Sequence, residues 1–331
     1  MNPTMQAYLL EGSPEAVQGA VQEVQTADLP AGEVTIRVAY SSVNYKDAMA
    51  AHGVGRMVRK LPHVPGIDLA GEVAEDASGR FNPGAPVLVT GYDLGIGHWG
   101  GYAEYARVPA DWVVPLPAGL TAFEAMTLGT AGLTAMLCLM ALERNGLTPA
   151  QGPVLVTGAT GGVGSIAVDL LAKGGYTVAA SSGKADMADA LKALGAAEVL
   201  TREEVTDASG KAFLAERWAA AIDNVGAATL EYLLRSVKYG GAVAICGMVG
   251  GNKFESTVFP FILKGVGLLG IDSVQCPMET RLAAWAKLAG GLKPAHLERI
   301  ARTIPLADLP AALKEILAGG ARGRYVVRVG G

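Results

Sequence analysis

Residues 154–164 read Val-Leu-Val-Thr-Gly-Ala-Thr-Gly-Gly-Val-Gly, and they decide the fold expected of this chain. A short β-branched apolar run meets a cluster of glycines, which opens directly into a segment with helical spacing at 165–172. Glycines allow a tight turn and a close approach of the backbone to a pyrophosphate, and the start of a helix supplies oriented N–H groups. The stretch therefore predicts the strand–turn–helix of a dinucleotide site rather than a tight structural turn.

The segments that follow this turn alternate between predicted strands and predicted helices. Helical spacing is seen, for example, over 184–194 and 227–236. The strand candidates are 153–157, 176–181, 197–201, 219–223, 241–246 and 266–271. Strands joined by alternating crossovers predict a doubly wound, six-stranded parallel sheet, so this part of the chain is expected to be an α/β domain of the Rossmann type.

The first part of the chain shows a different pattern, in which short strand candidates are separated by glycine and proline. These candidates are 34–40, 71–74 and 86–90. They predict a compact, irregular β-barrel-like domain. The last strand candidate of the chain, 324–329, is expected to return to this first domain.

A chain of 331 residues exceeds what one core usually organises, so two domains are expected. Helical passages outside the sheet are predicted over 121–142 and 279–290, and a further segment, 305–318, leads to the last strand. The barrel-like domain is assigned to residues 1–122 and 293–331, and the dinucleotide-binding domain to residues 123–292.

The composition narrows the class of protein. Half of the residues are apolar and 18% are charged, which is typical of a well-packed globular protein. A formal net charge of −4 argues against a nucleic-acid partner. Cys138, Cys246 and Cys276 lack metal-ligand spacing and are too few for a disulfide framework. Because the start resembles no secretion signal and the apolar runs are interrupted by Gly or Lys, we expect a cytoplasmic protein without a membrane span.

The end of the second predicted strand indicates which dinucleotide is bound. NAD sites usually place an acidic residue about 20 residues after the glycines, whereas NADP sites place hydroxyl groups and a cation there. The sequence over 181–184 is Ser-Ser-Gly-Lys. Ser181 and Ser182 can donate to a phosphate and Lys184 can pair with it, although a serine helix cap and a solvated lysine would explain the same residues. We predict NADP(H), with Arg202 as a further candidate contact.

A barrel-like domain ahead of a Rossmann-type domain resembles the medium-chain dehydrogenase/reductase superfamily, whose first domain is GroES-like. Its zinc alcohol dehydrogenases bind a catalytic metal through a Cys and a Gly-His-Glu run. The corresponding places here are Asn-Tyr-Lys-Asp at 44–47 and Pro-Gly-Ile-Asp at 65–68, which contain neither Cys nor His. His52, His63 and His98 are scattered. A catalytic zinc site needs three Cys, His or carboxylate ligands, so we expect no metal.

The whole chain resembles the zinc-free, quinone-oxidoreductase-like branch of that superfamily, and within it most closely the acryloyl-CoA reductase family. The resemblance is carried by residues 40–47, 65–68, 99–104, 157–164 and 182–184. It implies reduction of acryloyl-CoA to propionyl-CoA with NADPH. It also places the following residues at cofactor-contacting positions: Tyr45, Thr160, Gly161, Gly162, Val163, Ser182, Gly183, Lys184, Arg202, Met248 and Ser273.

The chemistry of such a reaction assigns roles to the first motif. A hydride adds to the β-carbon of the enoyl thioester, and the α-carbon must then receive a proton. Tyr45 is the candidate donor because a phenol keeps its proton at neutral pH, and Lys46 could ease its release. The same tyrosine could instead hydrogen-bond the nicotinamide, with solvent as the proton source. Asp47 and Asp68 are candidates to orient the lysine or the loop, or are capping residues of turns.

A cluster of cations lies between the two motifs that carry the resemblance. Arg56, Arg59 and Lys60 fall within six residues of one another. Coenzyme A carries a phosphate-rich tail, so these side chains are candidates to bind it. A solvated face of a loop is the alternative interpretation.

Other interpretations of the chain stay open at this point. The same scaffold would serve an NADPH:quinone reductase, a medium-chain enoyl thioester reductase or a non-catalytic NADPH-binding protein. By the same resemblance we expect a homodimer, because the superfamily commonly pairs the last Rossmann strand across a two-fold axis and residues 265–270 are apolar enough to do so.

Overall fold

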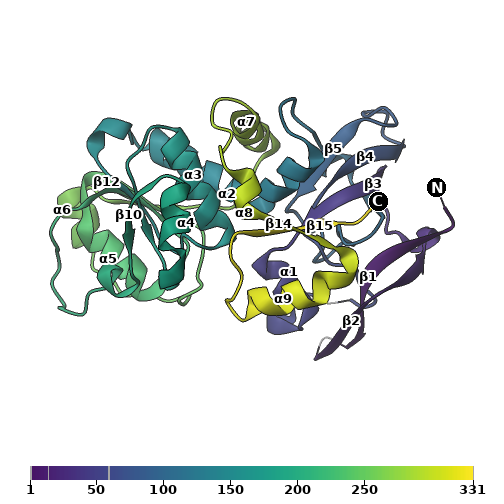
Figure 1. Cartoon of the computed structure of the whole chain (residues 1–331), viewed down its shortest axis with the longest axis horizontal. Helices are drawn as coiled ribbons and strands as arrows, with labels where there is room; N and C mark the ends of the chain where they lie inside the picture. Colours follow the sequence, from purple (N-terminus) through teal and green to yellow (C-terminus); the bar gives the residue numbers. More distant parts are fainter. Residues whose placement is uncertain (1, 14, 59, 331) are drawn as a thin grey trace. The chain divides into compact units, whose positions relative to one another are not determined.

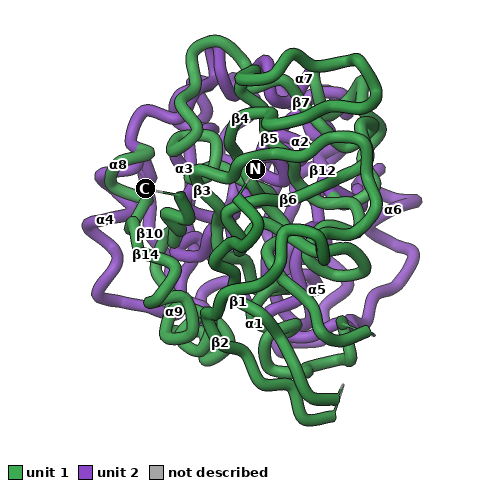
Figure 2. The backbone as a smooth tube through the Cα atoms, turned by 90° about the vertical axis from the view of Figure 1, so that its right-hand side faces the viewer, with its two compact units in different colours: residues 1–130, 274–282, 297–331 green, residues 131–273, 283–296 purple. Residues whose placement is uncertain are grey.

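The structure is a computed structural model that describes residues 2–13, 15–58 and 60–330. It forms two compact units, which Figure 2 shows in two colours. Unit 1 comprises residues 1–130, 274–282 and 297–331, and unit 2 comprises residues 131–273 and 283–296. Dividing points fall inside helices α2 (Ala122–Arg144) and α7 (Met278–Ala289). The domain boundaries suggested by the sequence, after residues 122 and 292, stay a prediction.

Unit 2 is built on a six-stranded parallel sheet. Its strands are β8 (Val154–Val156), β9 (Val178–Ser181), β10 (Ala196–Leu200), β11 (Trp218–Asp223), β12 (Val237–Ile245) and β13 (Gly267–Gly270). They pair in the order β10-β9-β8-β11-β12-β13, and every pairing is parallel. The doubly wound topology is therefore confirmed. The strand order reverses between β8 and β11, where sheets of this type bind their ligands.

Helices cover both faces of this sheet (Figure 1). They are α3 (Gly162–Lys173), α4 (Ala188–Ala193), α5 (Ala227–Ser236) and α6 (Phe259–Lys264), with 3-10 turns at Pro149–Gln151, Ala185–Met187 and Glu203–Val205. Strand β11 is buried along its whole length, as expected of a strand that is covered on both faces. Because the strands are parallel, their carboxyl ends meet at one edge of the sheet.

Unit 1 is built mainly from antiparallel strands. They are β1 (Thr4–Ser13), β2 (Ala16–Gln25), β3 (Val34–Ser42), β4 (Asp68–Asp76), β5 (Pro86–Thr90), β6 (Tyr105–Val108), β7 (Val114–Pro115), β14 (Ala301–Pro305) and β15 (Arg324–Arg328). β1 and β2 form a hairpin, and the others pair in the order β14-β15-β3-β4-β5-β7, with β6 also on β3. The last strand does return to this unit, because β15 pairs with β3. β1, β2, β6, β7 and β14 lie outside the predicted strands; β2, for example, is largely exposed and has no continuous apolar run.

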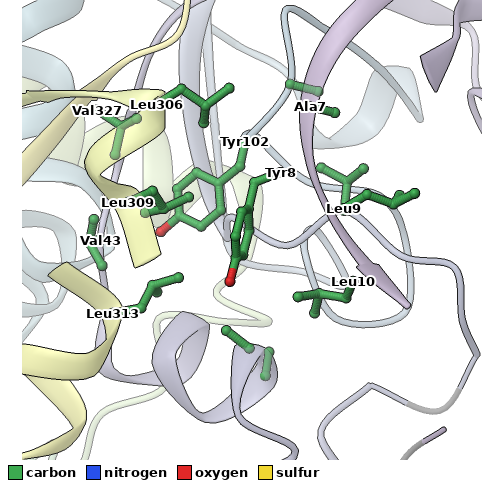
Figure 3. Packing of buried hydrophobic residues seen from close by; sticks show 14 of the residues in the cluster. Ala7, Tyr8, Leu9, Leu10, Val43, Tyr102, Leu306, Leu309, Leu313 and Val327 are labelled. Carbon is green, nitrogen blue, oxygen red and sulfur yellow. The ribbon is translucent and has the colours of Figure 1, made fainter. Parts of the chain in front are cut away.

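Short helices complete unit 1. They are α1 (Tyr45–Ala51), α8 (Leu297–Ile300) and α9 (Leu309–Leu317), with 3-10 turns at Thr26–Asp28, Val54–Arg56, Ala110–Trp112 and Leu306–Asp308. Figure 3 shows the core of this unit, in which Tyr8 and Tyr102 lie among leucines of β1 and α9. Val43 belongs to the same buried cluster. The backbone that leads into α1 is therefore anchored in the core.

Helix α2 differs from what the sequence suggested. By length and composition alone it could cross a bilayer, with a mean hydropathy of 1.8 over its most apolar window. That window is 83% buried inside the protein, which is typical of a core helix. At Gly129 the backbone leaves the helical region, with φ 50° and ψ −151°, so the helix is broken near its middle.

Candidate active site

The glycine turn of unit 2 has the backbone that its sequence predicts. β8 ends at Val156 and α3 begins at Gly162. Gly158 has a φ of +58°, which strains residues with a side chain. A Cβ atom on Gly164 would lie 2.4 Å from the carbonyl oxygen of Gly158, so the close packing of helix on turn requires glycine. The first N–H groups of α3, which have no partner within the helix, can therefore face a pyrophosphate.

A buried polar cluster fixes the start of the turn. The Thr157 hydroxyl donates to Oδ1 of Asp223 at 2.6 Å, and the Asn224 side chain donates to the Thr157 carbonyl at 2.8 Å. Asp223 also accepts from the N–H groups of Val225 and Gly226, at 3.1 and 3.0 Å. Burial raises the pKa of Asp223, and these donors oppose that rise. Our sequence analysis missed this cluster; the signal was an Asp-Asn pair at the end of the strand beside β8.

Ser182 connects two of the predicted cofactor segments. Its Oγ lies 3.1 Å from Oγ1 of Thr160, and it accepts from the N–H of Lys184 at 3.0 Å. The second contact closes a turn of three residues, and it is not the helix cap that the sequence offered as the alternative, because the following 3-10 turn has Lys184 at its N-cap position and no side-chain cap bond. Ser181 is placed differently, because its hydroxyl is buried and donates to the Thr201 carbonyl at 3.4 Å. Of the two serines, Ser182 is therefore the better placed to meet a ligand.

Two cations lie near Ser182. The Arg202 guanidinium packs against Gly183, where a Cβ atom would lie 3.2 Å from its Nη2. Arg202 is exposed and Lys184 is half-buried. A hydroxyl and two positive charges at the ends of β9 and β10 form a surface that suits a phosphate monoester.

The remaining cofactor candidates of unit 2 lie beyond the ends of β12 and β13. An open groove there is lined by residues 245–248 and 270–272, and Met248 is 58% exposed. Ser273 is buried and its Oγ accepts from Oγ1 of Thr134 at 2.8 Å. The structure thus brings the predicted cofactor residues of unit 2 to the carboxyl edge of one sheet.

In unit 1 the predicted proton donor stands at the first position of α1. Asn44 precedes the helix with extended backbone angles, and Tyr45 follows it. The Tyr45 side chain is 48% exposed and Lys46 is half-buried. Neighbouring side chains therefore confine Tyr45 only in part, while its backbone fixes the point from which the phenol extends.

Asp47 is fully buried and binds the backbone of two segments, the residue before α1 and the residue before β4. Its Oδ2 accepts from the N–H of Asn44 at 2.8 Å, and its Oδ1 accepts from the N–H of Ile67 at 2.9 Å. Burial, and then repulsion from Asp68, raise the pKa of Asp47 from 3.8 to about 6. These contacts support the loop-orienting role among the alternatives that the sequence left open.

Asp68 collects donors from three other segments of unit 1. Its Oδ2 accepts from Oγ of Ser42 at 2.6 Å, from Nδ2 of Asn44 at 2.8 Å and from the N–H of Thr130 at 2.9 Å. Its Oδ1 accepts from Oγ1 of Thr130 at 2.5 Å. The Thr130 N–H is available because α2 is broken at the preceding residue.

Arg324 of β15 completes this cluster, and the sequence analysis missed it. Its Nη1 donates to Oδ1 of Asn44 at 3.0 Å and to the Val43 carbonyl at 3.2 Å, and its Nη2 lies 3.8 Å from Oδ2 of Asp68. A Cβ atom on Gly129 would lie 2.5 Å from Asp68 Oδ2 and 2.8 Å from Arg324 Nη2. The isolated sequence gave no signal for Arg324, since nothing near residue 324 indicates that it faces residue 44.

Comparison with known proteins establishes the family. Residues 30–118 match the family described as Alcohol dehydrogenase GroES-like domain, and residues 162–289 match the Zinc-binding dehydrogenase family. AcuI of Ruegeria pomeroyi, an acrylyl-CoA reductase, is 50% identical over 94% of each chain. YhfP of Bacillus subtilis, named as a quinone oxidoreductase, is 48% identical over 99% of this chain and all of its own. The chain belongs to the medium-chain dehydrogenase/reductase superfamily.

Solved structures of this superfamily confirm the fold. The yhdH oxidoreductase of Salmonella enterica, crystallised with NADP, is 47% identical and has a TM-score of 0.95. The match covers 98% of this chain and 100% of the yhdH chain. The yhfP protein of B. subtilis, crystallised with NAD, has a TM-score of 0.97 and covers 99% of this chain with all of its own. The expected GroES-like domain and doubly wound domain are therefore both confirmed, as is the resemblance to the quinone-oxidoreductase-like branch of the superfamily.

The zinc that one family name implies does not fit the residues present. At the two places that correspond to metal ligands stand Asn44, whose amide bonds Asp68, and Ile67, which has no donor atom. The carboxylates of Asp47 and Asp68 are engaged by hydrogen bonds. Across the described residues, no group of three His, Cys, Asp or Glu side chains lies together as a metal site would require.

The cations predicted to bind coenzyme A lie in unit 1 after α1. Arg56 forms an ion pair with Glu15 at 3.2 Å, in which both side chains are mostly exposed. Lys60 is exposed, and Arg59 lies outside the described residues. Exposed pairs of this kind contribute little stability, so Arg56 can exchange its partner for a phosphate at low cost.

Proposed function

We propose that this protein uses NADPH to reduce the carbon–carbon double bond of a short enoyl-CoA, with acrylyl-CoA as the preferred substrate and propionyl-CoA as the product. The observation that carries this proposal is the 50% identity to the acrylyl-CoA reductase of R. pomeroyi over 94% of both chains. The misfit of the residues at the metal positions supports a reaction that needs no zinc.

The cofactor part of the proposal rests on the carboxyl edge of the sheet in unit 2. The glycine turn, including Thr160, Gly161, Gly162 and Val163, would face the pyrophosphate. Ser182, Gly183, Lys184 and Arg202 would hold the 2′-phosphate of NADPH, with Ser181 behind them. Met248 and Ser273 would lie along the nicotinamide half. The S. enterica relative was crystallised with NADP and the B. subtilis relative with NAD, so the activity of this protein needs to be compared with NADPH and with NADH.

The chemistry divides between the cofactor and the start of α1. When bound, NADPH supplies the hydride that is added to the β-carbon. Tyr45 would donate a proton to the α-carbon from its exposed phenol, with Lys46 beside it easing the release. Asp47 and Asp68 hold the backbone that carries Tyr45 and so would act on its position. Arg56, Arg59 and Lys60 would bind the phosphates of coenzyme A.

A quinone reductase is the second candidate function. The 48% identity to YhfP over all of that protein favours it, and an exposed Tyr45 would serve an uncharged acceptor equally well. The cation cluster separates the two candidates, because a quinone gives Arg56 and Lys60 nothing to bind.

We also infer that two copies of the chain associate through unit 2. Strand β13 forms one edge of the sheet, so the outer side of its backbone has no strand partner within the sheet. Beside it, Val258, Phe259, Ile262 and Leu263 in and before α6 are all more than 40% exposed. An apolar edge of this kind is stabilised when a second copy covers it.

The test is to measure NADPH oxidation with acrylyl-CoA, crotonyl-CoA and a benzoquinone in parallel, and to repeat it with NADH. We expect kcat/KM to be highest for acrylyl-CoA with NADPH. Lys184→Ala should raise the KM for NADPH about 10-fold or more and leave that for NADH nearly unchanged. Lys192→Ala, on the exposed side of α4, is the matched control. Turnover of the quinone that is faster by orders of magnitude would overturn the proposal.

A further inference from the structure

The buried guanidinium of Arg324 contacts the backbone that carries the proposed proton donor. We propose that Arg324 is a positioning residue for Tyr45: from β15 it fixes Val43 and Asn44, and thereby sets the direction in which the Tyr45 phenol leaves the first turn of α1. This inference rests on the proposed function, because it needs Tyr45 to take part in the reaction.

The hydrogen bonds of Arg324 converge on the segment before α1. Nη1 binds the Val43 carbonyl and the Asn44 side chain, and Nη2 donates to Oγ of Ser42 at 2.8 Å. Nε donates to the carbonyl of Thr127, in the part of α2 before its break, at 3.1 Å. One rigid fork thus ties β15 and α2 to three successive residues of the chain that leads into Tyr45.

The contacts reach Tyr45 through the backbone. Asn44 is the residue that caps α1, and its side chain is held by Arg324 at Oδ1 and by Asp68 at Nδ2. With both ends of this amide fixed, the first helical residue begins from one backbone geometry. The phenol of Tyr45 is about half exposed, so packing adds little to its orientation.

The charge balance explains why an arginine stands here. Arg324 is 3% exposed, its Nη2 lies 3.8 Å from Oδ2 of Asp68, and both Asp68 and Asp47 are fully buried. Burial lowers the pKa of Arg324, and the charges of Asp68 and Asp47 raise it again. A lysine at this position would keep the positive charge but could not reproduce the planar fork that reaches four acceptors at once. The substitution Arg324→Lys therefore separates charge from geometry.

The experiment compares Arg324→Lys, Tyr45→Phe and the double variant with the wild-type enzyme. We expect Arg324→Lys to lower kcat for acrylyl-CoA about 10- to 100-fold while KM for NADPH changes about twofold or less, because unit 2 is untouched. In the Tyr45→Phe background the same substitution should lower kcat about twofold or less, since the group that it positions is gone. Equal losses in both backgrounds would overturn the inference.

Two further measurements separate positioning from loss of stability. Arg235→Lys is the matched control, because Arg235 in unit 2 also binds a carboxylate and several carbonyls. It should lower the melting temperature about as much as Arg324→Lys and leave kcat unchanged. A drop in kcat with Arg235→Lys that matches the drop with Arg324→Lys would contradict the inference.

Amide exchange gives a readout that does not depend on turnover. Arg324→Lys should speed hydrogen exchange at the N–H groups of Asp47 and Ala48, which bond the Asn44 carbonyl, and Arg235→Lys should not. If the wild type reduces only a quinone, the proposed substrate fails and the same double-variant comparison is made with that acceptor. Unchanged exchange at Asp47 and Ala48 would refute the positioning role whatever the substrate is.

Discussion

Two buried aspartates hold the two segments on which the proposed reaction depends, and they do so by different means. Asp223 in unit 2 fixes the start of the glycine turn, and its partners come from Thr157 and from the two residues that follow Asn224. Asp68 in unit 1 fixes the start of α1, and its partners come from segments as far apart in sequence as Ser42 and Arg324.

The difference lies in charge and in the number of elements that supply the partners. Asp223 is held by neutral donors at the ends of two neighbouring strands, so the parallel sheet itself brings them together. Asp68 shares its site with a second buried carboxylate, Asp47, and with a buried guanidinium, Arg324. Buried charges are costly unless they are paired, so the start of α1 depends on β15, which supplies Arg324 to this site. The turn of unit 2 thus depends on one pair of neighbouring parallel strands, β8 and β11, whereas the start of α1 depends on β3, β4, α2 and β15 together.

The largest loss of stability should follow removal of the Asp223 carboxylate, which fixes the start of the glycine turn. Asp223→Ala leaves the Thr157 hydroxyl and two backbone N–H groups without their acceptor in a buried site, which should lower the free energy of unfolding by about 4 kcal/mol. Asp223→Asn, which keeps one acceptor oxygen, should lose less. Denaturant unfolding measures both, and NADPH fluorescence titration should show weaker binding by Asp223→Ala. Wild-type affinity in that variant would mean that the cluster does not shape the turn.

The charged cluster of unit 1 should reveal itself in the pH dependence of stability. In the folded protein the pKa of Asp47 is raised from 3.8 to about 6. Between these two pH values the folded protein therefore holds a proton on Asp47 that the unfolded chain has lost. The free energy of unfolding should therefore fall as the pH rises through that range, by about 3 kcal/mol in total, and then level off. Asp47→Asn removes this titration, so the difference in stability between the two proteins should change by most of that amount between pH 4 and 7. A constant difference across the range would contradict the raised pKa that burial and the charge of Asp68 give to Asp47.

Two glycines compare the two segments directly. Gly129→Ala places a Cβ atom 2.5 Å from Asp68 Oδ2 in a backbone region that only glycine adopts easily. Gly158→Ala strains φ and places its Cβ atom 3.3 Å from Cβ of Asn224, a much milder contact. We expect losses of about 3 and about 1 kcal/mol, a difference of about 2 kcal/mol. Thermal or denaturant unfolding of both variants measures this difference. Equal losses would show that the cluster around Asp68 can yield to a methyl group.

The smallest effect is expected at the exposed charges, outside both clusters. Arg56→Ala combined with Lys60→Ala should raise the KM for acrylyl-CoA about 2- to 5-fold and leave that for a small uncharged enone unchanged. Stability should hardly change, since the Arg56–Glu15 pair is exposed. Arg80→Ala removes a comparable exposed ion pair with Asp111 and serves as the control. An equal rise in KM for both substrates would remove these residues from coenzyme A binding.

The sequence predicted much of the fold and of the cofactor segment in unit 2, and little of the buried charged cluster in unit 1. The glycine turn at 158–164, the six strands and the serine and lysine after β9 could be found because their signals are local: periodicity, glycine and short spacing. The Asp223 cluster was missed although its residues adjoin predicted strands, because no pattern says which acceptor a buried threonine will meet. Arg324 and the break at Gly129 could not be found at all, since Arg324 meets Asn44 across 280 residues of chain and Gly129 packs against the side chains of this same cluster.

The sequence by itself determined the order of the elements, the place of the dinucleotide turn and the chemical character of the groups around it. These follow from side-chain type and from the fixed periods of strand and helix. Only the tertiary structure decided that Asp47, Asp68 and Arg324 share one buried site, and that Asn44 is held at both ends of its amide. The physical reason is desolvation: charges taken out of water must find partners, and which partners they find depends on how distant strands pair rather than on any local pattern.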